Sequence, residues 1–143
     1  MKLNLRSFTQ LTLAIAIALM FCSSPVSAHA SVKMPQLAKD TTLSKECKSD
    51  NWDEPTAPRH LYGNSWYVGT CGISVILIAN PQGHILIDSG PANAFEGVSK
   101  SLRAIGVRLN DIRTILTTHE HHDHMGGVAQ FQKASGATVL VRQ

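Results

Sequence analysis

Length, composition and charge already restrict the class of protein. The chain has 143 residues, 43% of them hydrophobic and 16% charged, which fits one globular domain and excludes a disordered protein. The formal charge is +3, but residues 1–30 hold Lys2, Arg6 and no acidic residue, so the remainder carries 11 basic against 10 acidic residues, a net of +1. Because no basic stripe remains, nucleic acid is not an expected partner.

Residues 1–30 have the pattern of a secretory signal peptide. A short basic region precedes the apolar run 11–21, and Ala28-His29-Ala30 supplies the Ala-x-Ala sequence that signal peptidases cut. We expect cleavage after Ala28 or Ala30 and a periplasmic or secreted protein. The alternative is a membrane anchor, but a run of 11 residues is too short to cross a bilayer. No membrane association is expected once the signal is removed.

The cysteines fit export. Cys22 could mark a lipoprotein, yet the Leu-Met-Phe before it lacks the small residues of such a site. Signal removal then leaves Cys47 and Cys71, and an even pair in an oxidising compartment predicts a disulfide. The alternative is a pair of buried free thiols.

After the signal, the chain divides into an arm and a patterned region. Residues 31–58 show no sustained period and are expected to form an irregular arm that Trp52, Pro55 and Pro58 pack onto the domain. Residues 59–143 alternate short apolar runs with turn residues. We expect strands at 60–62, 65–68, 73–79, 84–87, 112–116 and 138–141. The nearly continuous apolar run at 73–79 suggests a strand buried on both faces.

The pattern also predicts two helices. Phe95, Val98, Leu102 and Ile105 are spaced three or four residues apart, which draws an apolar stripe along a helix that Gly106 ends. A second helix is expected to start at Gly126-Gly127 and to close at Gly136. Strands in succession, followed by strand–helix–strand, predict an α/β sandwich.

A histidine cluster follows the strand predicted at 112–116. Four of the seven histidines lie within six residues, in His119-Glu120-His121-His122-Asp123-His124-Met125-Gly126-Gly127. Neutral imidazole and carboxylate are ligands that Zn²⁺ accepts. A solvated polar loop is the alternative, but strand, cluster and Gly-Gly coincide here. The other histidines, His29, His60 and His84, are expected to be structural.

Spacing suggests which members of the cluster meet. In extended chain leaving a strand, alternate side chains share a side, so His119, His121 and Asp123 are expected to converge. On this argument His124 faces elsewhere, next to a second metal ion, and Glu120 and His122 point away.

The motif His119-x-His121-x-Asp123-His124 after a strand, followed by Gly-Gly, resembles the metallo-β-lactamase superfamily. The stretches from Trp52 onward, Tyr62-Gly-Asn-Ser-Trp-Tyr-Val-Gly-Thr-Cys-Gly-Ile-Ser74 and Gly83-His-Ile-Leu-Ile-Asp88, resemble its subclass B3. Together these segments cover nearly all of the chain after the signal. The short metal motif indicates the superfamily, and the longer stretch with the export signal indicates B3.

The resemblance implies an αβ/βα sandwich with two zinc ions at one edge. This chain would be its N-terminal half, a mixed sheet with flanking helices. His119 and His121 match ligands of one ion, and Asp123 and His124 match ligands of the other. Asp88 matches an acidic position that supports the metal loop without binding metal. The implied reaction is hydrolysis of a small-molecule β-lactam by metal-bound hydroxide that Asp123 orients. No Gly-x-Ser-x-Gly or Ser-x-x-Lys nucleophile motif occurs.

One feature departs from the family pattern. The family supplies a third ligand to each zinc ion from its second half, whereas this sequence has no His, Asp or Glu after His124. We therefore expect a truncated piece that is inactive alone. Two alternatives stay open: another hydrolase of the superfamily, of thioesterase or nuclease type, and a non-enzymatic truncated product.

Overall fold

The computed structural model describes residues 30–36 and 46–141. The predicted signal segment up to residue 29 therefore lies outside the described residues. Within the described ranges no helix is both long and apolar enough to cross a membrane.

Six strands form one mixed sheet. They are β1 (Arg59–Tyr62), β2 (Ser65–Tyr67), β3 (Ile76–Ile78), β4 (His84–Ile87), β5 (Ile112–Leu116) and β6 (Thr138–Leu140), in that order across the sheet. Neighbours from β1 to β4 are antiparallel, whereas β4, β5 and β6 are parallel. The parallel strands share an edge for their carboxyl ends, and the chain leaving β5 enters the histidine cluster there. The predicted mixed sheet is confirmed.

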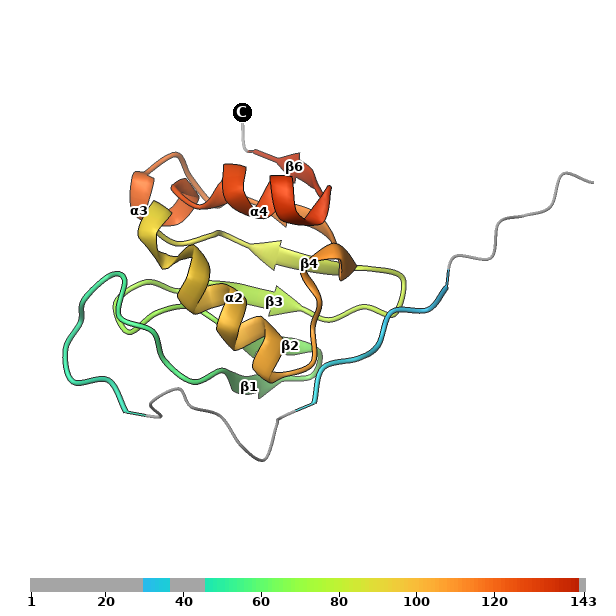
Figure 1. Cartoon of the computed structure of the whole chain (residues 1–143), viewed down its shortest axis with the longest axis horizontal. Coiled ribbons are helices and arrows are strands. Elements are labelled where there is room, and N and C mark those ends of the chain that lie inside the picture. The colour runs from blue at the N-terminus through green and yellow to red at the C-terminus, as the bar shows by residue number, and fades with distance from the viewer. Residues whose placement is uncertain (1–29, 37–45, 142–143) are drawn as a thin grey trace, which may run out of the picture.

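The helices lie mainly on one face of this sheet. They are the short 3₁₀ turns η1 (Ala92–Ala94) and η2 (Leu109–Asp111) and the helices α2 (Phe95–Ala104), α3 (His122–Met125) and α4 (Val128–Ser135). Figure 1 shows α2 and α4 on the same side of the strands, with α3 near the carboxyl end of β4. The rings of Phe95 and Phe131 meet edge-on at 4.7 Å and join α2 to α4. Both long helices were predicted, but α3 was not.

Glycines end both predicted helices. Gly136 is the C-cap of α4 with φ of 72°, and Gly106 follows α2 with φ of 80°. This left-handed conformation favours glycine, because a Cβ there is strained.

The core lies between the helices and one face of the sheet. A row of side chains crosses that face from strand to strand: Trp66, Leu77, Leu86, Ile115 and Val139 occupy paired positions. The first four are buried, and Val98, Leu102 and Phe131 of the helices join the same cluster. The apolar stripe predicted on α2 therefore faces the core.

The opposite face of the sheet is less covered. Ile76 and Ile78 flank the fully buried Leu77 and are only half-buried, and Leu140 stays 49% exposed. The prediction that residues 73–79 form a strand buried on both faces is wrong for the described structure. Only 76–78 pair as a strand, and the described helices α2 and α4 lie on one side of it.

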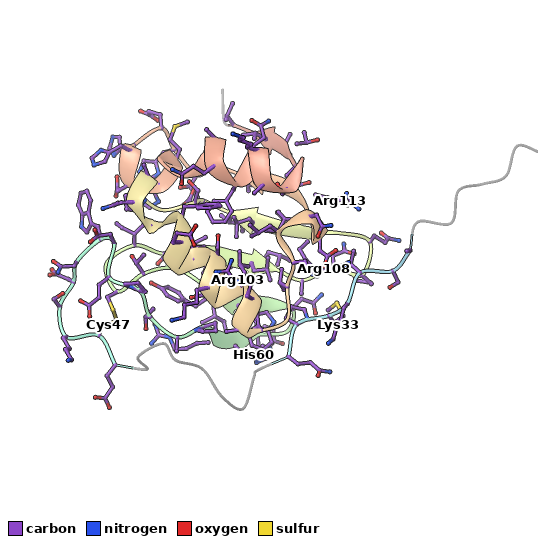
Figure 2. The ribbon with its side chains drawn as sticks, viewed as in Figure 1. Lys33, Cys47, His60, Arg103, Arg108 and Arg113 are labelled. Carbon is purple, nitrogen blue, oxygen red and sulfur yellow. A yellow bond between two sulfur atoms is a disulfide. The ribbon has the colours of Figure 1, made fainter. Side chains whose placement is uncertain are left out.

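The described parts of the arm lack helices and strands and are held at specific points. A disulfide joins Cys47 to Cys71, as predicted, with Cα atoms 5.5 Å apart. Figure 2 labels Cys47 on the loop that runs along the edge of the domain. Pro58 is buried, whereas Trp52 is 49% exposed. The Trp52 ring packs on the ring of His122 in the histidine cluster, so Trp52 contacts the domain at its surface, as expected for this residue of the arm.

Candidate metal centre

Asp88 connects the ends of two neighbouring parallel strands. It follows β4, and one of its carboxylate oxygens accepts hydrogen bonds from the backbone N–H of Thr118 (2.8 Å), just after β5. The other oxygen accepts one from the Thr118 hydroxyl at 2.8 Å. Asp88 is 5% exposed and has a φ of 60°, which is rare for a residue with a Cβ and costs about 1–2 kcal/mol. Strain of this kind is typical of functional sites.

The second half of the motif is helical. Residues 122–125 form α3, so the prediction that extended alternation continues to Asp123 is wrong. The helical turn reverses the chain, because the N–H groups of His124 and Met125 bond back to the carbonyl of His121 at 3.0 Å. The turn brings the His124 ring to 4.1 Å from the ring of His119, so His124 does not face elsewhere.

Three imidazoles and one carboxylate meet in this way at the sheet edge. The His119 ring also lies 4.7 Å from that of His121. The Nε2 atom of His124 lies 3.3 Å from a carboxylate oxygen of Asp123. The four residues singled out by their spacing thus lie close together. A helical turn brings them there, whereas an extended chain was expected.

A carboxylate orients the His124 ring. Its Nδ1 lies 2.9 Å from Oδ2 of Asp88, and because an ionised carboxylate only accepts, a hydrogen bond between them needs the proton on Nδ1. A neutral ring held in this way would offer a metal ion the lone pair of Nε2, on the side of Asp123. Metal-binding histidines use this arrangement, in which the second ring nitrogen donates to a carboxylate. The expectation that Asp88 supports the metal loop agrees with these contacts.

The donor types and their spacing fit zinc. Two donors on one tetrahedral zinc ion, each about 2.0–2.1 Å from it, are about 3.3 Å apart. The observed separation between Nε2 of His124 and Oδ2 of Asp123 is 3.3 Å. Within residues 30–36 and 46–141, however, no three His, Cys, Asp or Glu side chains are grouped so that they could hold an ion. The described residues therefore offer one donor pair whose separation suits zinc, Asp123 and His124, but no complete cage.

His122 has a different neighbour. Its ring packs on Trp52 with ring centroids 5.6 Å apart, which agrees with the expectation that this side chain points away from the group. Glu120 is exposed, as His121 also is, so the direction of the Glu120 side chain stays a prediction.

Two of the histidines predicted to be structural, His60 and His84, lie outside the cluster. His60 bonds the Gly63 carbonyl oxygen through Nε2 at 2.9 Å, and its ring contacts Trp66 edge-on. His84 is completely buried, and burial lowers the pKa of its imidazole below the ordinary 6.5, an effect that Asp111 partly opposes. His29 lies outside the described residues.

Sequence reasoning missed three neighbours of the cluster. Trp52 reaches His122 from 70 residues away in the chain. The Thr118 hydroxyl lies 2.9 Å from Nδ1 of His119. Ser89 bonds the backbone of His124. Two of them carried a signal in the sequence, because Ser89 directly follows Asp88 and Thr118 directly precedes His119.

Comparison with known proteins decides the family. The model of the metallo-beta-lactamase superfamily matches residues 68–143, more than half of the chain. The chain belongs to the metallo-beta-lactamase superfamily.

Solved structures show which members of the superfamily this chain is similar to. The metallo-beta-lactamase MIM-1 from Novosphingobium pentaromativorans is 52% identical with a TM-score of 0.64, over 70% of this chain and 38% of that one. MEM-A1, a subclass B3 metallo-beta-lactamase from a soil metagenome library, is 45% identical with a TM-score of 0.61, over 62% of this chain and 34% of that one. The resemblance to subclass B3 is confirmed at the level of structural neighbours. The chain spans little more than a third of either neighbour.

The superfamily is broader than β-lactamases. A hydroxyacylglutathione hydrolase from Albidiferax ferrireducens is 42% identical over 56 residues, which make up 39% of this chain and 20% of that protein. Membership therefore establishes a hydrolase superfamily and leaves the substrate to be argued.

Proposed function

We propose that this chain is part of a zinc-dependent hydrolase of subclass B3 type that opens the β-lactam ring of antibiotics. The observation that carries the proposal is the meeting of His119, His121, His124 and Asp123 at one sheet edge. Identity of 45–52% to β-lactamases such as MEM-A1 and MIM-1 supports the substrate class.

Each residue has a role in this proposal. His119 and His121 donate to one zinc ion, and Asp123 and His124 donate to the other. Bound zinc would supply Lewis acidity and lower the pKa of water toward about 7. The Asp123 carboxylate, beside Nε2 of His124, orients the attacking water. Asp88 holds the His124 ring, so that its free nitrogen stays on the side of Asp123.

Thioester hydrolysis is the second candidate. It is favoured by the 42% identity to a hydroxyacylglutathione hydrolase over 56 residues. That segment is shorter than the match to MIM-1, which covers 70% of the chain at 52% identity. We therefore rank β-lactams first.

The two candidates are separated by one experiment. The chain is fused to the remaining C-terminal portion of MIM-1, and zinc-loaded fusion is assayed with a chromogenic cephalosporin and with a glutathione thioester. We expect chelator-sensitive hydrolysis of the cephalosporin and none of the thioester. The fusion carrying His121→Ala controls for activity that does not use this site. Preferential thioester hydrolysis would replace the first candidate by the second.

We also propose export to the periplasm or outside the cell, with cleavage after Ala28 or Ala30. N-terminal sequencing of exported protein should begin at His29 or Ser31. Mature protein that starts at Met1 would contradict this location.

A further inference from the structure

Ser89 lies directly beneath the helical turn that carries His124. It is completely buried. The carbonyl oxygen of His124 accepts two hydrogen bonds from this one residue, from the backbone N–H at 2.8 Å and from the hydroxyl at 3.0 Å. The same hydroxyl accepts the N–H of Gly127 at 3.1 Å. Ser89 therefore fastens the strand end to both sides of the α3–α4 junction.

Ser89 and its neighbour hold opposite ends of one residue. Asp88 binds the His124 ring at Nδ1 (2.9 Å), and Ser89 binds the His124 carbonyl. A ring hydrogen bond alone leaves the backbone of α3 free to slide, and a backbone bond alone leaves the ring free to rotate. Together the two contacts fix both the position and the direction of Nε2.

The junction offers little room to shift. A Cβ at Gly127 would lie 2.8 Å from the carbonyl oxygen of Ser89, and one at Gly126 would lie 2.7 Å from the backbone nitrogen of Ala92. The backbone of the Gly126-Gly127 pair therefore lies directly against the segment that follows Asp88. This close approach explains why the hydroxyl of Ser89 can reach both polar groups.

We propose that Ser89 is a positioning residue that sets the location of His124 for metal binding. The part of this proposal that concerns metal binding rests on the proposed function. Ligand geometry has to be held within about 0.5 Å, so loss of the hydroxyl should displace Nε2 enough to weaken binding. Removing a partner that orients a ligand typically costs about 10–100-fold in metal affinity. Because Ser89 acts through the backbone, we expect about 10-fold, the lower end of that range.

The chain offers a matched control. Ser135 is also buried, its hydroxyl donates to the Phe131 carbonyl (2.6 Å), and it accepts the Ala137 N–H (3.1 Å). Ser135→Ala thus removes the same two kinds of hydrogen bond at the end of α4, outside the cluster. Both variants should lower thermal stability by similar amounts.

The test compares Ser89→Ala with Ser135→Ala in the full chain, by NMR of the histidine side chains. In metal-free protein we expect the Nδ1 proton of His124 to exchange faster with water in Ser89→Ala only. In a zinc titration we expect about 10-fold weaker binding at the His124 ring in Ser89→Ala only. Equal effects of the two variants, or none on either measurement, would overturn the proposal. If wild-type chain fails to bind zinc while the exchange difference persists, the positioning role stands and the proposed metal function fails.

Discussion

The imidazole of His122 packs on the indole of Trp52, with ring centroids 5.6 Å apart, and so leaves the group that its neighbours form. His121 lies on the other side, with its ring 4.7 Å from that of His119. Two adjacent histidines thus have different surroundings, and substitution can separate their roles.

We expect His121→Ala to weaken zinc binding by more than about 100-fold, beyond what loss of an orienting partner costs. His122→Ala should leave it within about 3-fold, since that ring contacts Trp52 and no ligand. Zinc affinity of both variants, measured by competition with a chelator in the MIM-1 fusion, checks this. Similar losses in the two variants would mean that His122 also binds metal.

Reduction of the Cys47–Cys71 disulfide should destabilise the fold. The bond closes a loop with a sequence separation of 24 residues. In the chain-entropy model such a loop contributes about 3.5 kcal/mol. Denaturant unfolding with and without reductant measures the difference, and intact mass verifies the oxidised state. Two alkylatable thiols in exported, unreduced protein would show that the bond does not form.

Stability should fall in mild acid because of His84. Its Nδ1 accepts the backbone N–H of Asn80 at 3.1 Å, which requires the neutral ring, and burial lowers its pKa from 6.5. The unfolded chain takes up a proton as the pH falls below 6.5, whereas the folded chain resists it. The contribution of His84 is therefore complete above this pH and is lost progressively below it.

Asp111, next to His84, is expected to cause a second loss of stability at a lower pH. The hydrogen bonds from Arg108 hold the pKa of Asp111 below its ordinary 3.8, so its contribution is lost only in stronger acid. Figure 2 shows Arg108 at the same end of the molecule as Lys33. A backbone hydrogen bond with Lys33 also raises the pKa of His84 and so opposes part of the effect of burial. Urea unfolding between pH 8 and pH 5 should show the loss in wild type and a smaller one in His84→Gln. Equal pH dependence in both would exclude His84 as the cause.

The chain by itself should not hydrolyse β-lactams at a useful rate. Each donor pair lacks a third protein donor among the described residues, and no His, Asp or Glu follows His124 in the sequence. Catalytic zinc normally has three protein ligands and a water. We expect hydrolysis of a chromogenic cephalosporin in excess zinc to be more than about 100-fold slower than by the MIM-1 fusion. Comparable, chelator-sensitive rates would mean that another chain supplies the missing ligands.

Aggregation should accompany this inactivity. Leu116 and Leu140 are 38% and 49% exposed and occupy paired positions on the sheet face opposite α2 and α4. Contiguous exposed apolar surface promotes association. Light scattering of the chain should therefore exceed that of the fusion. Monodisperse chain at high concentration would contradict this expectation.

The sequence by itself determined the local elements and which side chains gather beyond the end of β5. Alternation and apolar spacing located the strands and α2, because burial on one face imposes a period on the chain. Glycine positions located helix ends at Gly106 and Gly136, since the left-handed conformation selects that residue. Residue chemistry and spacing together singled out His119, His121, Asp123 and His124.

Only the tertiary structure decided how those residues meet. The four-residue helix α3 is too short to leave a periodic pattern, and it overturned the alternation expected from an extended chain. The contacts of Asp88 with Thr118 and His124 span 30 and 36 residues, and those of Trp52 with His122 span 70. Such pairs depend on which strands lie side by side. Local sequence patterns do not predict that arrangement, because it is set by packing of the whole sheet against its helices.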